Sequence, residues 1–315
     1  MAESTQAAFI HASVDSGIAT ITIRRPEALN ALNEQVVSEL EAAFDQASQR
    51  PDVRAVVLEG SGKAFIAGAD IKFFIEHVEA GTIPKILEFT RRGHRLLRKL
   101  ETCFKPVIAK VNGLALGGGT ELSLACHAIV ATEKASFGLP ETGIGIYPGL
   151  GGTQRTPRAV GKELGKYLIF SGQLVDGKTA HELGLARYFA PSEEVDAYVK
   201  ELVLSGKIAD KFAPRPVPQG WEPVAEAFSD ARVADMIAGK AAGDDPRVQQ
   251  AAKVIPRKAP LAIRFANRVV DEGLRKDLES GLELELSGLM EIFATKDALH
   301  GLKSIGAYKP EFKGE

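Results

Sequence analysis

Two glutamates and a glycine triplet lie close together within residues 111–152. The triplet comes just before Glu121, and Glu141 follows in a second glycine-rich stretch. Three successive glycines weaken the interior of a helix or strand, which indicates that bare backbone is needed there. The apolar spacing that follows predicts a helix over residues 120–128, so the triplet would lie where a helix begins. Free N–H groups and the positive dipole end at such a place stabilise an oxyanion, within one turn of Glu121.

The two glutamates are also candidates for acid–base chemistry. Each has an ordinary explanation by itself, Glu121 as an acid in a first helical turn and Glu141 as a loop acid after Pro140. These explanations account poorly for the triplet, the AGAD stretch before it and the PGLGG turn after it. Two carboxylates that meet in a poorly hydrated pocket have separated pKa values, which suits one general acid and one general base.

The composition of the whole chain excludes several other classes of protein. Its 315 residues, 45% hydrophobic and 25% charged, are typical of a soluble globular protein with a sizeable core. The 39 basic residues nearly balance the 41 acidic ones, which argues against nucleic acid or a membrane surface as partner. Cys103 and Cys126 lie in apolar stretches, which indicates buried thiols in a reducing compartment. No secretory signal or membrane-spanning run is visible, so we expect a cytoplasmic protein.

Strands and helices alternate along the first part of the chain, which is typical of an α/β domain. We expect two short strands within residues 9–23, separated by a turn at Asp15-Ser16-Gly17, and further strands at 53–58 and 107–111. Helices are expected at residues 32–48 and 83–100.

The second part of the chain differs in composition. Prolines interrupt a charged, alanine-rich piece over residues 207–245, which predicts an insert or linker with one helix at 224–238. Residues 260–294 are rich in leucine and glutamate and predict two helices.

Two other motifs could indicate a different class of function, the binding of a nucleotide or RNA. Residues 172–179, GQLVDGKT, match a phosphate-binding loop, but that loop needs a preceding strand, and residues 160–170 have helical spacing instead. We therefore expect a joint between two helices there. A basic helix face, more often a solvated surface than a ligand site, could attract phosphates. It consists of Arg91, Arg92, Arg95, Arg98 and Lys99. A non-catalytic RNA- or nucleotide-binding protein on the same fold stays as the alternative.

Five longer stretches closely resemble the crotonase (enoyl-CoA hydratase/isomerase) superfamily. They read RRPEALNALN, FIAGADIK, VNGLALGGGTEL, LPETGIGIYPGLGGTQR and FSGQLVDGKTAHELGLARY. The resemblance implies an α/β fold, a crotonase-like spiral of ββα units with a helical C-terminal region that builds trimers or dimers of trimers. The expected domains are a spiral core with the CoA and acyl site (1–204), a proline-rich insert or linker (205–250) and a C-terminal helical oligomerisation region (251–315).

The resemblance also assigns roles to particular residues. It implies an oxyanion hole made by the backbone N–H groups of Ala69 and Gly118, which would bind the thioester carbonyl of an acyl-CoA. The hydratase branch has two glutamates, matching Glu121 and Glu141, whereas isomerases generally keep the second alone. The remaining substrate- and CoA-binding positions are Ala67, Gly68, Asp70, Ile71, Lys72, Gly117 and Gly149. Coenzyme A is part of the substrate, so neither a separate cofactor nor a metal is expected.

We therefore expect an enoyl-CoA hydratase of fatty-acid β-oxidation, which adds water across the 2,3 double bond of a 2-enoyl-CoA. Glu121 would activate the water and Glu141 would protonate the α-carbon, with both sharing one water. The alternatives on the same fold are a Δ3-Δ2 enoyl-CoA isomerase and a hydratase specialised for cyclic or dienoyl-CoA substrates. Phe73, Phe74 and Tyr147 depart from the family pattern and are candidates for narrowing the acyl pocket.

Overall fold

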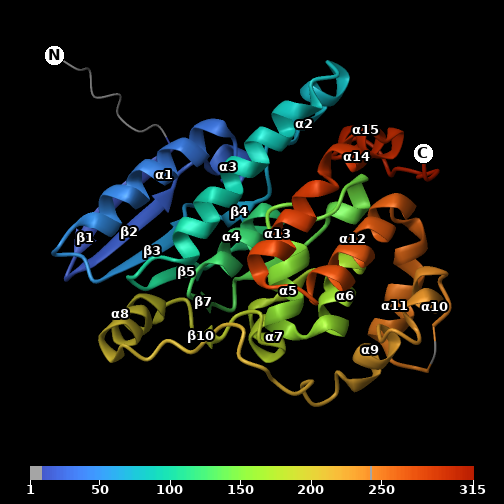
Figure 1. Ribbon diagram of the computed structural model, residues 1–315. Coiled ribbons are helices and arrows are strands. Elements are labelled where there is room, and N and C mark those ends of the chain that lie inside the picture. Colours follow the sequence, from blue (N-terminus) through green and yellow to red (C-terminus); the bar gives the residue numbers. More distant parts are fainter. Residues whose placement is uncertain (1–8, 242) are drawn as a thin grey trace.

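The computed structural model describes residues 9–241 and 243–315, and its strands form two mainly parallel sheets (Figure 1). The larger sheet has the order β1-β2-β3-β5-β7-β10 and the smaller one the order β4-β6-β8-β9. The strands of the larger sheet are β1 (Ile10–Asp15), β2 (Ile18–Ile23), β3 (Ala55–Gly60), β5 (Val107–Val111), β7 (Ala128–Ala131) and β10 (Tyr188–Phe189). Those of the smaller sheet are β4 (Ala64–Ala67), β6 (Leu114–Leu116), β8 (Ser136–Gly138) and β9 (Val175–Asp176). The first eight residues of the predicted core domain lie outside the described part.

The α-helices are most numerous in the second half of the chain. Those before residue 200 are α1 (Glu34–Gln49), α2 (Ile71–Glu79), α3 (Ile83–Glu101), α4 (Gly118–Ala125), α5 (Gly152–Val160), α6 (Lys162–Ser171), α7 (Gly177–Leu183) and α8 (Val195–Ser205). The later ones are α9 (Glu222–Ala227), α10 (Val233–Ile237), α11 (Pro246–Val254), α12 (Pro260–Gly273), α13 (Leu278–Ser287), α14 (Leu289–Phe293) and α15 (Lys296–Ser304). Short 3₁₀ helices are η1 (Pro26–Ala28), η2 (Glu141–Ile144) and η3 (Ile255–Arg257).

From β3 to β8, successive strands alternate between the two sheets. β3, β5 and β7 are neighbours in the larger sheet, and the strands that follow them, β4, β6 and β8, belong to the smaller one. Helices follow each pair: α2 and α3 after β4, α4 after β6, and η2 and α5 after β8. The chain therefore winds as a spiral of ββα units, and α12 to α15 form a helical C-terminal region (Figure 1). Within it, α12 and α13 lie beside α5, α14 contacts α3, and α15 contacts α2 and η2. This confirms the predicted fold class.

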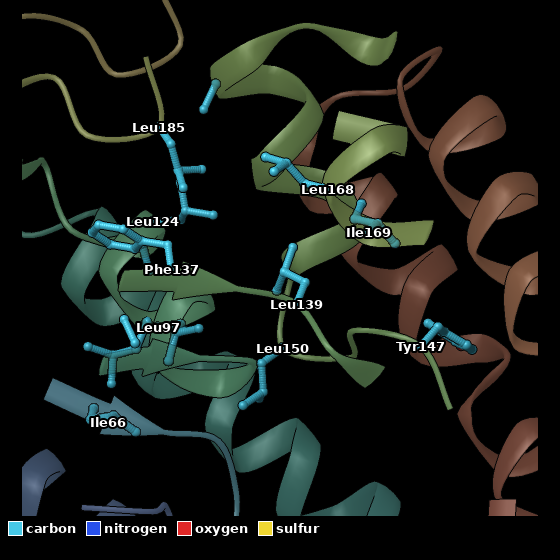
Figure 2. Packing of buried hydrophobic residues seen from close by; sticks show 14 of the residues in the cluster. Ile66, Leu97, Leu124, Phe137, Leu139, Tyr147, Leu150, Leu168, Ile169 and Leu185 are labelled. Atoms are coloured by element: carbon cyan, nitrogen blue, oxygen red, sulfur yellow. The ribbon is translucent and has the colours of Figure 1, made fainter. Parts of the chain in front are cut away.

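The local predictions agree with the structure where the hydrophobic pattern is strong. β1 and β2 form an antiparallel hairpin in which Asp15 faces Ile18, and Ser16 and Gly17 have φ values of 52° and 79°. A positive φ at both central residues matches the right-handed twist of the strands. α1 and α3 confirm the helices predicted at residues 32–48 and 83–100. The buried side chains of the main hydrophobic cluster come from many elements, as Figure 2 shows for Ile66 of β4, Leu97 of α3, Leu124 of α4 and Phe137 of β8.

Two helix predictions differ from the structure. Residues 224–238 contain α9 and α10 instead of one helix, because a turn at residues 228–232 interrupts them. Residues 260–294 contain α12, α13 and α14 instead of two helices, because Gly288 separates the last two. Apolar residues of α9 and α10, among them Val224 and Met236, still join the main core, and Phe228 in the turn between them packs edge-on against Tyr167 of α6 at 5.6 Å. The three-part division of the chain stays a prediction.

The segment that matches a phosphate-binding loop follows a helix, as predicted. α6 ends at Ser171, and only the two-residue strand β9 comes before α7. Lys178 is exposed, while a Cβ at Gly177 would overlap the Thr132 carbonyl oxygen. Gly177 is therefore explained by packing against the β7 end of the sheet. Within the two described ranges, no helix is both long and apolar enough to cross a bilayer.

Candidate active site

A cavity of about 300 Å³ brings together most of the residues that the sequence singled out. The predicted residues that line it are Ala67, Gly68, Ala69, Ile71, Phe74, Gly117, Gly118, Glu121, Glu141, Tyr147 and Gly149. Residues that the sequence did not single out complete the wall. They are Phe89, Thr90, Leu116, Pro140, Ile144, Ile146, Leu150, Leu289, Phe293 and Ile305. Most of these are apolar residues whose pattern marks them as core, and nothing in the sequence distinguishes a cavity wall from a core.

The glycine triplet lies at the start of α4, which begins at Gly118, two residues earlier than predicted. Gly117 has a φ of +46°, and a Cβ there would overlap Oε1 of Glu141. A Cβ at Gly119 would overlap the carbonyl oxygen of Ile66 on β4. The glycines therefore permit close approach of α4 both to a glutamate and to the neighbouring strand.

Two of the backbone N–H groups at this cavity that lack an acceptor among the described residues are those of the predicted oxyanion hole. One belongs to Gly118, the first residue of α4, which has no partner within its own helix. The other belongs to Ala69, which forms an isolated parallel bridge with Leu32. In this bridge the Gly68 carbonyl and the Asp70 N–H face Leu32, at 2.9 and 2.8 Å. Because backbone groups alternate in direction, the Ala69 N–H points away from Leu32.

Glu121 is buried in the first turn of α4, with 2% of its surface exposed. Its Oε1 accepts hydrogen bonds from the N–H groups of Leu150 and Gly152, at 2.7 Å each. Burial raises the pKa of Glu121 well above its usual value, and the charges of Glu141 and Glu285 raise it further. The two N–H bonds oppose this rise, since they stabilise the carboxylate.

Glu141 is the first residue of η2 and is also buried. Its Oε2 has no hydrogen-bond partner within the described part of the protein. Burial raises the pKa of Glu141 to about 8, and its own backbone N–H lowers it less than burial raises it. Two neighbouring carboxyl groups with raised pKa values hold a proton between them near neutral pH. The site can therefore present one acid and one base.

Three predicted residues lie outside the cavity lining. Asp70 caps the start of α2, where its Oδ1 accepts the Lys72 N–H at 3.2 Å, and it pairs with Arg25 at 2.8 Å. The side chain of Lys72 is exposed. Phe73 packs against Phe89, with ring centroids 5.0 Å apart.

The aromatic end of the cavity is built from distant parts of the chain. Phe74 contacts Phe293 of α14, with centroids 5.2 Å apart. Tyr147 stacks on Phe265 of α12 at 6.0 Å, and its hydroxyl donates to the Glu285 carbonyl at 2.6 Å. Figure 2 shows Tyr147 set beside the C-terminal helices, away from the central side chains. The C-terminal region therefore forms part of the site.

Known proteins resemble this chain over nearly its whole length. A family model described as enoyl-CoA hydratase/isomerase matches residues 18–312. The sequence is 34% identical over 307 residues to a probable enoyl-CoA hydratase of Bacillus subtilis, covering 97% of this chain and 99% of that one. It is 34% identical over 281 residues to a short-chain-enoyl-CoA hydratase of Clostridium acetobutylicum, covering 89% and 87% of the two chains.

A solved structure resembles the fold closely. The crystal structure of a carnitinyl-CoA dehydratase from Mycobacterium thermoresistibile has a TM-score of 0.85 to this structure, covering 97% of this chain and 91% of that one. Their sequences are 23% identical, so the likeness concerns the fold alone.

Proposed function

Because the chain belongs to the enoyl-CoA hydratase/isomerase family and is an enzyme of the hydratase type, we propose that Glu121 and Glu141 perform its acid–base chemistry. The enzyme adds water across the 2,3 double bond of a 2-enoyl-CoA thioester to give a 3-hydroxyacyl-CoA. One observation carries the assignment: two buried carboxyl groups and two N–H groups without acceptors open on one cavity.

The proposed oxyanion hole consists of the Ala69 and Gly118 N–H groups. Charge builds on the thioester oxygen when water adds at C3, and donors already in place stabilise that charge without reorganisation. Removal of one such donor in other enzymes raises the barrier by about 2.7–4 kcal/mol. The absence of a competing acceptor for either N–H supports this role.

The two glutamates then divide the proton transfers. The water oxygen forms its bond to C3 while its proton passes to the Glu121 carboxylate, and the proton of Glu141 passes to C2. One water is thereby added with no oxidation or reduction, and transfer of the proton from Glu121 to Glu141 returns the pair to its starting state. The hydrogen bonds support this division, because Glu121 Oε1 accepts two N–H groups whereas Glu141 Oε2 accepts none.

We also propose a short acyl chain, as the name of the short-chain-enoyl-CoA hydratase relative suggests, together with an oligomeric state and a compartment. Hydration involves no net oxidation or reduction, so the proposal includes no redox cofactor. It also includes no metal, since the two carboxyl groups and the two N–H donors take the roles of acid, base and oxyanion stabiliser. Coenzyme A enters with the substrate. A homotrimer or dimer of trimers is proposed from family membership, with exposed Phe104 (84%) and Leu204 (68%) as candidates for subunit contact.

The unpaired Cys103 and Cys126 support a reducing compartment such as the cytoplasm, where the enzyme would serve β-oxidation.

The test of this function uses crotonyl-CoA, a four-carbon 2-enoyl thioester. We expect the absorbance of the conjugated thioester to fall and the product mass to rise by one water. A Δ3-Δ2 isomerase would instead convert a 3-enoyl-CoA to the conjugated isomer with no change of mass. Failure to hydrate crotonyl-CoA and longer or cyclic 2-enoyl-CoA thioesters would refute the proposal, and salt-sensitive RNA binding or ATP binding would then favour the non-catalytic alternatives.

Gly117→Ala is expected to lower kcat by about 10²-fold, the usual cost of misplacing a catalytic group by about 1 Å. The new methyl group would overlap Glu141 Oε1 and push that carboxyl group from its place. The measurement is kcat for crotonyl-CoA, with circular dichroism to verify folding. Gly81→Ala serves as control, because Gly81 also has a positive φ but nothing lies within 4 Å of its Cβ position.

Phe74→Leu should shift the substrate preference toward longer acyl chains. The smaller side chain opens space beside Phe293 at the aromatic end of the cavity. Each methylene accommodated in an apolar pocket changes specificity by about tenfold or more. We expect the ratio of kcat/KM for octenoyl-CoA to that for crotonyl-CoA to rise about tenfold. The same ratio in Phe73→Leu should stay near the wild-type value, since Phe73 does not line the cavity.

A further inference from the structure

A third buried carboxylate shares the active-site loop with Glu121. The loop connects η2 to α5, and its successive N–H groups donate alternately to Glu121 and to Glu285. The donors to Glu121 are Leu150 and Gly152, at 2.7 Å each; those to Glu285 are Gly151 and Thr153, at 2.6 and 3.1 Å. Because Gly151 and Thr153 are bound to Glu285, the N–H groups that lie between and beside them are fixed in the positions from which they orient Glu121.

Glu285 reaches both ends of this loop from α13. It is fully buried, and its Oε2 also accepts the Thr153 hydroxyl at 2.5 Å. Its backbone carbonyl accepts the Tyr147 hydroxyl at 2.6 Å, at the other end of the loop. His94 of α3 adds a contact: its Nε2 donates to the Gly149 carbonyl at 2.7 Å and lies 3.5 Å from Glu285 Oε1.

The negative charge of Glu285 also acts on the two proposed catalytic glutamates. Its negative charge raises the pKa of Glu121 and that of Glu141, in addition to the larger effect of burial. The basic groups that face it come from α3 and α5. They are His94, which lies 3.5 Å from Glu285, and Arg158, which binds backbone carbonyls; Arg155, also on α5, is paired with Glu101 instead. No described arginine or lysine forms an ion pair with Glu285, so its field on the two glutamates is not cancelled by direct pairing.

We propose that Glu285 is a positioning residue for hydration, which holds the loop that orients Glu121 and sets the negative field that the two catalytic glutamates experience. This inference rests on the proposed roles of Glu121 and Glu141. The field favours retention of one proton on the pair, which is the state that the reaction needs. Glu285 itself does not line the cavity and does not touch the reacting atoms.

The test is Glu285→Gln, with kcat and KM for crotonyl-CoA measured as functions of pH. The variant keeps the shape of the side chain but removes the charge. Loss of a nearby negative charge lowers the pKa of the pair, so the alkaline limb of the kcat profile should move to lower pH by about one unit. We also expect kcat to fall between about tenfold and about 10²-fold, with KM nearly unchanged. Glu283→Gln is the matched control, since Glu283 is exposed on the same helix and carries the same charge.

A second measurement separates this inference from the proposed function. Carboxyl carbon NMR of the ligand-free protein, labelled at glutamate, should show lower pKa values for Glu121 and Glu141 in Glu285→Gln but not in Glu283→Gln. An inactive wild-type enzyme that shows this shift would refute the function and keep the coupling. An active wild-type enzyme whose pH profile is the same in Glu285→Gln, even at reduced stability, would overturn the inference.

If Glu285→Gln does not fold, Glu285→Asp decides the question. This variant keeps the charge and shortens the reach to Gly151 and Thr153 by one methylene. We then expect kcat to fall by about tenfold or more while the alkaline limb keeps its position. An unchanged kcat in this variant would overturn the inference.

Discussion

Glu121→Gln and Glu141→Gln are each expected to lower kcat for crotonyl-CoA hydration by about 10²–10⁴-fold, the usual contribution of one general acid or base. Glutamine preserves the shape of either side chain but can neither accept the proton of the water nor give one to C2. Both side chains are buried at one cavity, so bulk water cannot readily replace them. The measurement is the initial rate of absorbance loss under saturating substrate, with KM determined in parallel.

The two variants should differ in a second reaction. Exchange of the α-protons of butyryl-CoA with deuterium oxide needs the oxyanion hole and the carboxyl group that transfers a proton to and from C2. It does not need an activated water. We expect Glu121→Gln to retain this exchange and Glu141→Gln to lose it. The opposite pattern would reverse the assigned roles, and near-wild-type hydration in either variant would remove that residue from the mechanism. Glu88→Gln is a suitable control, because Glu88 is an exposed residue of α3 next to the cavity-lining Phe89.

The sequence predicted the elements whose pattern is local. The hairpin of β1 and β2 and the helices α1 and α3 follow from hydrophobic periodicity and turn residues, which act over a few positions. The sequence does not predict the break at Gly288 because the apolar spacing continues across it, and the need for glycine at this position is set by tertiary packing. A Cβ at Gly288 would lie 2.8 Å from the Tyr147 hydroxyl, whose position the sequence around Gly288 does not reveal.

The site was predictable to the extent that its motifs are contiguous. Glu121, Glu141 and the glycine triplet occur within about 25 residues of each other, and the structure brings them to one cavity. Asp70 is predicted as a binding position because the backbone of the AGADIK stretch resembles a CoA-binding segment; its side chain caps α2, and the role of its backbone stays a prediction. Glu285 could not be recognised, since a glutamate in a helical, leucine-rich stretch is ordinarily a surface residue.

Glu101→Gln is expected to lower the free energy of unfolding by about 3–5 kcal/mol, because it leaves the buried Arg155 guanidinium without its counterion. Arg155 has a fully buried side chain and binds Glu101 through two nitrogens, at 2.9 and 3.2 Å. Lys211 joins the same carboxylate at 2.8 Å and also donates to carbonyls at the end of α4. The network therefore ties α3, α4 and α5 to the segment before α9. Urea denaturation measures the loss, and Asp52→Asn, in an exposed pair with Arg50, should leave the midpoint nearly unchanged.

The pH dependence of this loss identifies the charge as its cause. Burial alone would raise the pKa of Glu101, but the hydrogen bond and charge of Arg155, together with Lys211, lower it to about 2. Because the folded-state pKa is below the unfolded value of 4.5, the stabilisation is fully present above that value and is lost as pH falls toward 2. At the lowest pH the protonated Glu101 is as neutral as glutamine. The stability difference between wild type and Glu101→Gln should therefore shrink steadily below about pH 4.5. A difference that stays constant from pH 7 to pH 3 would show that packing, not the buried ion pair, is responsible.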